Sequence, residues 1–298
     1  MTGVFTFIGV STGSSAIQRI YPRWAAELGL DARLVGVDLP LDAPPADYRA
    51  AVEQIRDDPN GLGGLITTHK LNVLAATRDL FHELNDSARL LHEVSCISKR
   101  DGQLHGAALD DQTSMLALNR IRDPHDWADS ELLLLGAGGA SVATTLGLHH
   151  APGAPARIHV TARSSRRLDE MRKLHGEIGF SIPINYHVTE SAEAADRLVA
   201  GLASRSVVVN ATGMGKDRPG SPLTDRVRFP EDAIAWDMNY RGERRFLQQA
   251  AQPGVEVVDG WDYFVYSWTR VVAVVHGIDI PASGPLFDKL SAIARDSA

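Results

Sequence analysis

The chain has 298 residues, of which 44% are hydrophobic and 22% charged, a composition typical of a globular protein long enough for two domains. Its formal net charge of −7 argues against a nucleic-acid-binding protein, which usually has a basic surface. The single cysteine, Cys96, excludes an intramolecular disulfide and fits a reducing compartment, so we expect a cytoplasmic protein. No apolar run is long enough for a membrane span, and the N-terminus is not typical of a signal peptide.

The first sixty residues alternate between strand and helix patterns. Apolar runs at 5–10 and 32–39 predict strands. The patterns at 19–30 and 47–58 predict amphipathic helices, the first ending near Gly29. This alternation favours an α/β fold with a largely parallel sheet and helices on both faces.

The next fifty residues continue the pattern and end in a hairpin. The run 63–66 predicts a buried strand, and helical patterns extend through residues 72–91. Residues 94–109 predict two antiparallel strands that turn at Asp101-Gly102, a dipeptide favoured in tight hairpin turns.

A second cycle of strands begins at residue 131. Its run of leucines without polar alternation is typical of a parallel strand buried on both faces. Helical stretches lie between most of the later strands, and the last 50 or so residues are helical apart from one short strand. The later strands are expected at 156–165, 206–215, 233–240 and 255–260.

A lysine stands where the strand at 63–66 ends. Residues 67–69 bring the chain to Lys70, just before the next helical pattern. The simplest interpretation is a solvated surface lysine without a functional role. The alternative is a functional amine, because open α/β sheets bind ligands at the carboxyl ends of their strands.

A glycine-rich turn, GAGGAS, directly follows the leucine strand and opens a helix. In that context Gly136 allows the tight turn, Gly138 lets backbone approach a pyrophosphate, and Ser141 permits close packing of helix on strand. The helix amino end offers free N–H groups and a positive dipole to phosphates. We therefore predict a Rossmann-type dinucleotide site, against the alternative of a glycine turn without a ligand.

The next strand ends in ARSSRR (162–167), without the acidic residue that an NAD site places there for the ribose 2′-OH. Arginine pairs well with phosphate, which favours NADP. Two alternatives stay open. The segment is a basic start to a surface helix, or Ser164 and Ser165 serve a 2′-OH and NAD binds.

Taken in order, these motifs resemble those of the shikimate/quinate dehydrogenase family. LITTHK (65–70) is similar to the family's V-T-x-P-x-K pattern, with Thr68 for the proline, and GAALD (106–110) to its G-x-N-T-D motif. VVNATGMG (208–215) resembles N-A-T-x-x-G-M, WDMNY (236–240) resembles D-x-x-Y, and the stretch from Asp259 to Trp268 resembles the G-L-x-M-L-x-x-Q helix start. The resemblance covers most of the chain.

The resemblance implies an N-terminal α/β substrate domain with a mostly parallel sheet, a Rossmann-type NADP-binding domain, and C-terminal helices that return to the first domain. We place these at 1–112, 113–240 and 241–298. It also implies reversible hydride transfer between a secondary alcohol of a cyclic hydroxy-carboxylic acid and a nicotinamide, as in aromatic amino acid biosynthesis. The protein is then expected to be a monomer or homodimer with a small-molecule substrate.

The resemblance assigns catalysis to Lys70 as general acid/base and to Asp110 as the group that orients it. It assigns substrate contacts to Ser15, Ile17, Lys70, Ser95, Asp110, Tyr240 and Ser267. It assigns NADP contacts to Gly136, Ala137, Gly138, Gly139, Ala140, Ser141, Ala162, Arg163, Ser164, Arg166, Asn210, Ala211, Thr212, Met214, Met238 and Gly260.

The substrate positions depart from the family's residues. The early S-x-S pair, which holds the substrate carboxylate, survives only as Ser15, with Ile17 at its second position. Ser95, Ala108 and Ser267 stand where the family has longer amides. These changes favour a substrate other than shikimate itself. They also keep a second hypothesis open, a non-catalytic NAD(P)-binding or redox-sensing relative. A third, a folate-linked dehydrogenase, is not expected to carry Asp110 together with the DMNY segment.

Other residues have simpler interpretations. The histidines show no H-x-x-x-H spacing, so no metal is predicted. Cys96 is interpreted as a small core residue, and Asp111 as a solvated or helix-capping carboxylate. Trp261, Tyr263, Tyr266 and Trp268 are expected to form an aromatic cluster, mostly in the core.

Overall fold

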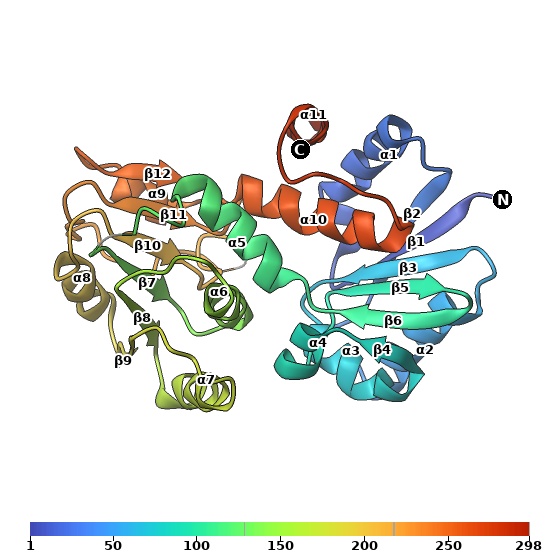
Figure 1. Cartoon of the computed structure of the whole chain (residues 1–298), viewed down its shortest axis with the longest axis horizontal. Helices are drawn as coiled ribbons and strands as arrows, with labels where there is room; N and C mark the ends of the chain where they lie inside the picture. Colours follow the sequence, from blue (N-terminus) through green and yellow to red (C-terminus); the bar gives the residue numbers. More distant parts are fainter. Residues whose placement is uncertain (128, 217, 298) are drawn as a thin grey trace. The chain divides into compact units, whose positions relative to one another are not determined.

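The computed structural model describes residues 1–127, 129–216 and 218–297. The chain forms two compact units (Figure 1). Unit 1 comprises Met1–Leu109 and Val265–Ala298, and unit 2 comprises Asp110–Phe264. Within the described ranges no helix is long and apolar enough to cross a membrane.

Unit 1 is built on a six-stranded sheet in which only β5 runs against its neighbours. The carboxyl ends of all the other strands therefore meet at one edge of the sheet, and β5 begins at that same edge. The strand order is β2 (Ala32–Asp38), β1 (Gly3–Gly9), β3 (Gly61–Ile66), β5 (Cys96–Arg100), β6 (Gln103–Ala107) and β4 (Phe81–Leu84).

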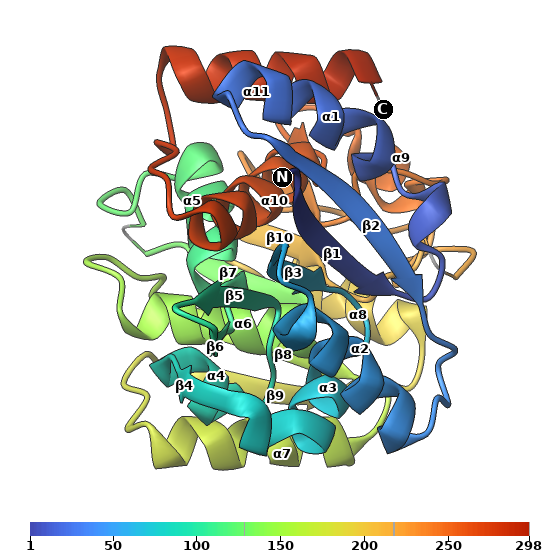
Figure 2. The same cartoon turned by 90° about the vertical axis from the view of Figure 1, so that its right-hand side faces the viewer.

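Helices cover both faces of this sheet (Figures 1 and 2). One face carries α1 (Ile17–Leu28), α10 (Trp261–His276) and α11 (Pro285–Ser297). The other carries α2 (Pro45–Asp57), α3 (Lys70–Thr77) and α4 (Asp86–Leu91), whose apolar side chains form one core with the strands. Short 3₁₀ turns at η1 (Thr12–Ser14) and η2 (Arg78–Leu80) complete the unit.

Several local predictions for unit 1 are confirmed. Gly29 ends α1 in the left-handed conformation, with φ of 67°. The hairpin turns at Asp101 and Gly102, whose φ angles of 50° and 76° are those that a tight two-residue turn requires. The prediction of helix through residues 72–91 is wrong in its centre, where β4 pairs with β6. With only its first and last residues buried, β4 is too short to show strand periodicity.

Unit 2 contains a six-stranded sheet that is parallel throughout. Numbered within the unit, the order is 3-2-1-4-5-6, the dinucleotide-binding arrangement, and the order reverses between β7 and β10. The strands are β9 (Ile184–Val188), β8 (Arg157–Ala162), β7 (Glu131–Leu135), β10 (Val207–Asn210), β11 (Ile234–Asp237) and β12 (Glu256–Val258). The strand β9 was not predicted, because it is half-exposed at the edge and has no apolar run.

The helices of unit 2 are α5 (Asp110–Ile121), α6 (Gly139–His149), α7 (Ser165–Glu177), α8 (Ala192–Ala200) and α9 (Arg245–Ala250). Side chains of α8 and α9 share a core with one face of the sheet. The helices α6 and α7 cover the other face (Figure 1).

The observed division differs from the expected boundaries, most at the C-terminal side. Residues 241–264 were expected to return to the first domain, but they belong to unit 2. The cause is β12, which extends the sheet by pairing with β11. The return begins at Val265, within α10.

Candidate active site

Lys70 is the first residue of α3 and follows the end of β3 after a three-residue turn. Ser95 directly precedes β5, at the same edge of the sheet. This edge also receives the end of β1, after which η1 and Ser15 follow. The structure therefore places Lys70, Ser95 and Ser15 at the carboxyl edge of the unit 1 sheet, where open α/β sheets bind ligands.

The turn before Lys70 has an unusual backbone. Thr68 has φ of 59°, a left-handed conformation that a β-branched residue rarely adopts. His69 follows with its ring buried, Nε2 lying 2.9 Å from the carbonyl oxygen of Leu39 and Nδ1 3.2 Å from the Tyr48 hydroxyl. The buried ring fixes the residue next to Lys70. The sequence contains His69 in the lysine motif, but its type alone did not indicate this anchoring role.

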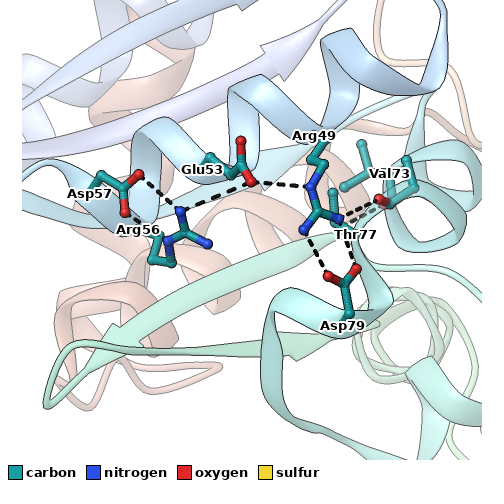
Figure 3. A network of polar contacts seen from close by, with 8 residues as sticks. Arg49, Glu53, Arg56, Asp57, Val73, Thr77 and Asp79 are labelled. Carbon is teal, nitrogen blue, oxygen red and sulfur yellow. Dashed lines mark hydrogen bonds and ion pairs between the residues drawn. The ribbon is translucent and has the colours of Figure 1, made fainter.

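The η2 turn that directly follows α3 is tied to α2 by an ion pair (Figure 3). The Arg49 guanidinium donates to both oxygens of Asp79, at 2.9 and 2.7 Å, and to the Ala76 carbonyl oxygen. The same side chain pairs with Glu53, one turn along α2. A bidentate arginine–carboxylate pair has a defined geometry. The helix that begins at Lys70 is thus held at both ends.

Asp110 is the first residue of α5 and follows Leu109, the last residue of that part of unit 1. Since β6 ends at Ala107, the chain reaches Asp110 directly from the edge that carries Lys70. The interpretation of Asp111 as solvated is wrong, because its side chain is buried in the first turn of α5.

The other predicted substrate residues differ in accessibility. Ser15 and Ser267 are half-buried in unit 1, and Tyr240 is half-buried in unit 2. Ile17 has no exposed surface and packs in the core under α1. Ser95 is also buried, and its hydroxyl bonds to backbone groups.

The glycine turn of unit 2 has the geometry that a phosphate site needs. Gly136 has φ of 106°, and a Cβ there would lie 3.1 Å from the Ala211 carbonyl oxygen, so a side chain at this position would be strained. Ser141 closes the turn by donating to the Gly136 carbonyl oxygen at 2.6 Å. Gly138 caps the N-terminus of α6, and a Cβ added there meets nothing within 4 Å. The remaining residues, Ala137, Gly139 and Ala140, complete the turn and the first turn of α6.

The segment after β10 is cross-linked by buried amides. Asn210 donates to the Met214 carbonyl oxygen at 3.2 Å and to Asp237 Oδ1 at 3.1 Å. Asn239 donates to the same Met214 oxygen at 3.0 Å. Thr212 donates to Asn210 Oδ1 at 2.6 Å. Both strand ends lie at the carboxyl edge, where Ala211, Met238 and Gly260 are also found.

Asp237 is fully buried at the end of β11. Its Oδ1 accepts from Asn210 and from the Asn239 N–H, whereas Oδ2 has no hydrogen-bond partner among the described residues. Burial raises the pKa of this carboxyl to about 6, against the smaller effect of the hydrogen bonds that favour the carboxylate. Asp237 is thus set apart from the exposed carboxylates of the chain.

The three arginines after β8 are not equivalent. Arg166 and Arg167 both pair with Glu170, at 3.6 and 2.9 Å. Arg163 is exposed and makes no ion pair with any described residue. Ala162 ends β8 and Ser164 is the N-cap of α7. Arg163 is therefore the guanidinium that a 2′-phosphate could bind without breaking an existing pair.

The expected aromatic cluster is divided between two cores. Trp261 packs near Tyr240, with ring centroids 6.0 Å apart, and both belong to unit 2. Tyr266 stacks on Phe287 at 4.6 Å, and Trp268 packs edge-on to Phe7 at 5.1 Å in unit 1. The expectation of one cluster is wrong, because α10 begins in unit 2 and continues in unit 1, so its aromatic side chains pack in different cores. The expectation that most of them are buried is confirmed for Trp261, Tyr266 and Trp268.

Two simpler interpretations can also be compared with the structure. Cys96 has no exposed surface, and burial raises the pKa of its thiol to about 12, so the core interpretation is confirmed. Among the described residues no group of three or more His, Cys, Asp or Glu side chains could hold a metal ion.

The chain is similar to known proteins over nearly its whole length, although no family model matches it. A shikimate dehydrogenase (NADP⁺) from Nostoc sp. is 28% identical over 264 residues, covering 86% of this chain and 85% of that protein. The fold is that of shikimate 5-dehydrogenase from Listeria monocytogenes, solved in complex with shikimate and NAD, with a TM-score of 0.77, 20% identity and coverage of 98% and 96%. The 5-ketofructose reductase of Gluconobacter sp. has the same fold, with a TM-score of 0.74, 19% identity and coverage of 99% of both chains. The order of motifs, the two-sheet architecture and these similarities agree: the chain has the fold of the shikimate/quinate dehydrogenases and resembles them in sequence over most of its length.

Proposed function

We propose that the chain is an NADP-dependent oxidoreductase that interconverts a secondary alcohol of a cyclic hydroxy-carboxylic acid and the corresponding ketone. The observation that carries the proposal is the placement of Lys70 at the carboxyl edge of the unit 1 sheet, with Asp110 three residues after the end of β6 at that edge. A lysine and a carboxylate are the groups that this proton transfer needs.

The residues of unit 2 fit a dinucleotide. The turn from Gly136 to Ser141 leaves open space at Gly138, and the N–H groups of the first turn of α6 are available to a pyrophosphate. Arg163 would bind the 2′-phosphate of NADP. The nicotinamide, when bound, accepts or supplies the hydride.

The chain's own residues supply the proton chemistry. Lys70 Nζ takes the hydroxyl proton when the alcohol is oxidised and returns it when the ketone is reduced. The Asp110 carboxylate orients the lysine and the hydroxyl by hydrogen bonding. General acid–base assistance of this kind contributes roughly 10²- to 10⁴-fold to the rate.

The substrate class follows from the family, and the altered positions narrow it. Ile17 and Ala108 supply no polar atom, and the Ser95 hydroxyl is committed to the backbone. A substrate must therefore rely on fewer hydrogen bonds than the family motifs provide. We propose a cyclic polyol acid that differs from shikimate in size or substitution, within or close to aromatic amino acid biosynthesis.

The same altered positions favour a second candidate, a redox sensor that binds NAD(P) without turnover. An absorbance assay distinguishes the two candidates. An enzyme changes NADPH absorbance with at least one cyclic hydroxy acid or amino analogue, whereas a sensor does so with none. We further propose a cytoplasmic enzyme, supported by its single buried thiol, and a monomeric or homodimeric state.

The catalytic assignment is tested by Lys70→Ala and Asp110→Asn. Each should lower kcat by at least about 10²-fold on the best substrate of an absorbance screen and leave the NADPH dissociation constant unchanged. Lys173→Ala, which removes an exposed lysine from α7, is the control for loss of a positive charge. Near wild-type kcat in either variant would remove that residue from the mechanism.

A further inference from the structure

The segment between β6 and α5 is held by two side chains that come from opposite sides. Residues 107–109 form the last stretch of unit 1 before Asp110. Ala108 and Leu109 are buried, so each backbone N–H and C=O there needs a partner. Since β6 has ended, ladder bonds no longer supply all of them.

Asn85 provides the partners on the β4 side. Its backbone N–H donates to the Gly106 carbonyl oxygen at 3.0 Å, which continues the pairing of β4 with β6. Its side chain then takes over, with Nδ2 donating to the Ala108 carbonyl oxygen at 3.0 Å and Oδ1 accepting from the Ala108 N–H at 3.1 Å. The amide thus pairs with both polar backbone groups of Ala108. Oδ1 also caps α4 by accepting from the Ala88 N–H at 2.9 Å.

Ser95 provides the partners on the β5 side. Its backbone N–H donates to the Ala107 carbonyl oxygen at 2.9 Å. Its buried hydroxyl accepts from the Leu109 N–H at 3.0 Å and makes a longer bond to the same Ala107 oxygen at 3.4 Å. Four consecutive backbone groups, from the Ala107 carbonyl to the Leu109 N–H, are therefore satisfied by Asn85 and Ser95 alone.

We propose that Asn85 and Ser95 form a clamp that positions Asp110 for catalysis by fixing the backbone immediately before it. The proposal rests on the catalytic role of Asp110 proposed above. In the clamp Ser95 acts through Leu109 and not by contact with the substrate. This reassigns a residue that the family resemblance places among the substrate contacts. Asn85 lies outside every motif of the resemblance, and its N-cap position was hidden within the stretch predicted as helix.

Positional control of this kind matters because the rate depends steeply on geometry. A displacement of about 1 Å at a catalytic group can cost roughly 10²-fold in rate. Asp110 is two peptide bonds from Ala108, so loosening Ala108 moves the carboxylate away from its catalytic position. Because a carboxylate shifts the pKa of the group that it orients, this movement also displaces the pH profile.

The test uses Asn85→Ser and Ser95→Ala. Serine caps a helix about as well as asparagine but is too short to reach Ala108, so Asn85→Ser preserves α4 and removes only the clamp. We expect kcat to fall about 10- to 100-fold, with the pH profile of kcat displaced and the NADPH dissociation constant unchanged. The double variant should lose less than the product of the two single effects, because both side chains hold one segment. Ser191→Ala, which removes the N-cap bond of α8, is the control for a small loss of stability.

The outcomes separate this proposal from the proposed function. If Asp110→Asn lowers kcat while Asn85→Ser and Ser95→Ala keep wild-type kcat and pH profile, the clamp is overturned and the proposed function stands. A lower melting temperature in the clamp variants with an unmoved pH profile, as expected for Ser191→Ala, also overturns it. If Asp110→Asn itself keeps full activity, the catalytic role proposed for Asp110 is wrong, and the clamp proposal that rests on it is wrong as well.

Discussion

At the scale of the residue, two residues near strand ends have features that cost free energy, one in its backbone and one in its side chain. Thr68 adopts a left-handed backbone two residues before Lys70, and Asp237 buries a carboxyl oxygen with no partner among the described residues. Such features concentrate at functional sites, where the surrounding structure maintains them. Both lie at the carboxyl edge of their sheet, and each leads to a direct prediction.

The backbone at residue 68 should tolerate glycine and reject proline. A left-handed conformation costs a non-glycine residue about 1–2 kcal/mol, while glycine loses about 0.5–1 kcal/mol through its greater freedom in the unfolded chain. Thr68→Gly should therefore be neutral or stabilise by up to about 1 kcal/mol in urea unfolding. Thr68→Pro, which restores the residue of the family motif, should destabilise by more than about 1 kcal/mol because proline cannot reach a φ of 59°. Thr68→Ala keeps the left-handed cost and serves as the control; a proline variant as stable as wild type would contradict the observed turn.

Asp237 should give the stability of the protein a recognisable pH dependence. Its pKa is raised to about 6, so the folded state holds a proton that the unfolded state releases near pH 3.8. The resulting stabilisation is fully present below pH 3.8 and is lost as the pH rises through about 6. Relative to Asp237→Asn, wild type should lose about 3 kcal/mol of unfolding free energy between pH 4 and pH 7.5.

The comparison with Asp237→Asn is needed because a histidine acts in the opposite sense. Burial lowers the pKa of His175 to about 4, so its contribution is present above pH 6.5 and is lost as the pH falls towards 4. In wild type the pH dependence contributed by His175 therefore opposes that contributed by Asp237. A constant difference between wild type and Asp237→Asn across this pH range would show that Asp237 is ionised throughout.

At the scale of the element, the site depends on how helices begin. Lys70 opens α3, Asp110 opens α5 and the glycine turn opens α6. Each follows a strand end with a short connection, which limits where the functional group can lie. The start of α7 is different, because its arginines compete for one carboxylate and leave Arg163 available.

That difference predicts which arginine selects the cofactor. NADPH should bind more tightly than NADH, and Arg163→Ala should remove most of the difference, about 10- to 150-fold in dissociation constant. Arg167→Ala is the matched control, since its guanidinium already pairs with Glu170, and should change the ratio less. Calorimetry that finds equal affinities for the two cofactors in wild type would contradict the assignment to NADP.

At the scale of the whole molecule, each unit supplies one part of the chemistry. Unit 1 carries Lys70 on a mixed sheet, and unit 2 carries the glycine turn where its strand order reverses. Two connections join the units, between Leu109 and Asp110 and between Phe264 and Val265. The proposed clamp lies at the first of these connections.

Substrate selection should reflect the reduced set of polar contacts in unit 1. Each missing bond to a neutral hydroxyl costs about 0.5–1.5 kcal/mol and a lost bond to a carboxylate about 1.5–3 kcal/mol. We expect a kcat/KM for shikimate below about 10⁵ M⁻¹s⁻¹ and better turnover of a bulkier or differently substituted relative. The measurement is kcat/KM for shikimate, quinate and larger analogues, side by side. A higher value for shikimate would show that the altered positions are tolerated.

The sequence by itself determined the alternation of strands and helices, the glycine turn and the strand end that carries Lys70. These features depend on local periodicity and on residues such as Gly29, Asp101 and Gly136, whose backbone conformation is a property of the residue and its neighbours. Only the tertiary structure decided the features that depend on long-range pairing. The short strand β4 exists because β6 lies beside it, and residues 241–264 stay in unit 2 because β12 pairs with β11. The roles of Asn85 and Ser95 likewise could not be predicted from the sequence. The backbone groups to which their side chains bond at Ala107 and Ala108 lie 12 to 23 residues away along the chain and come close only in the folded sheet.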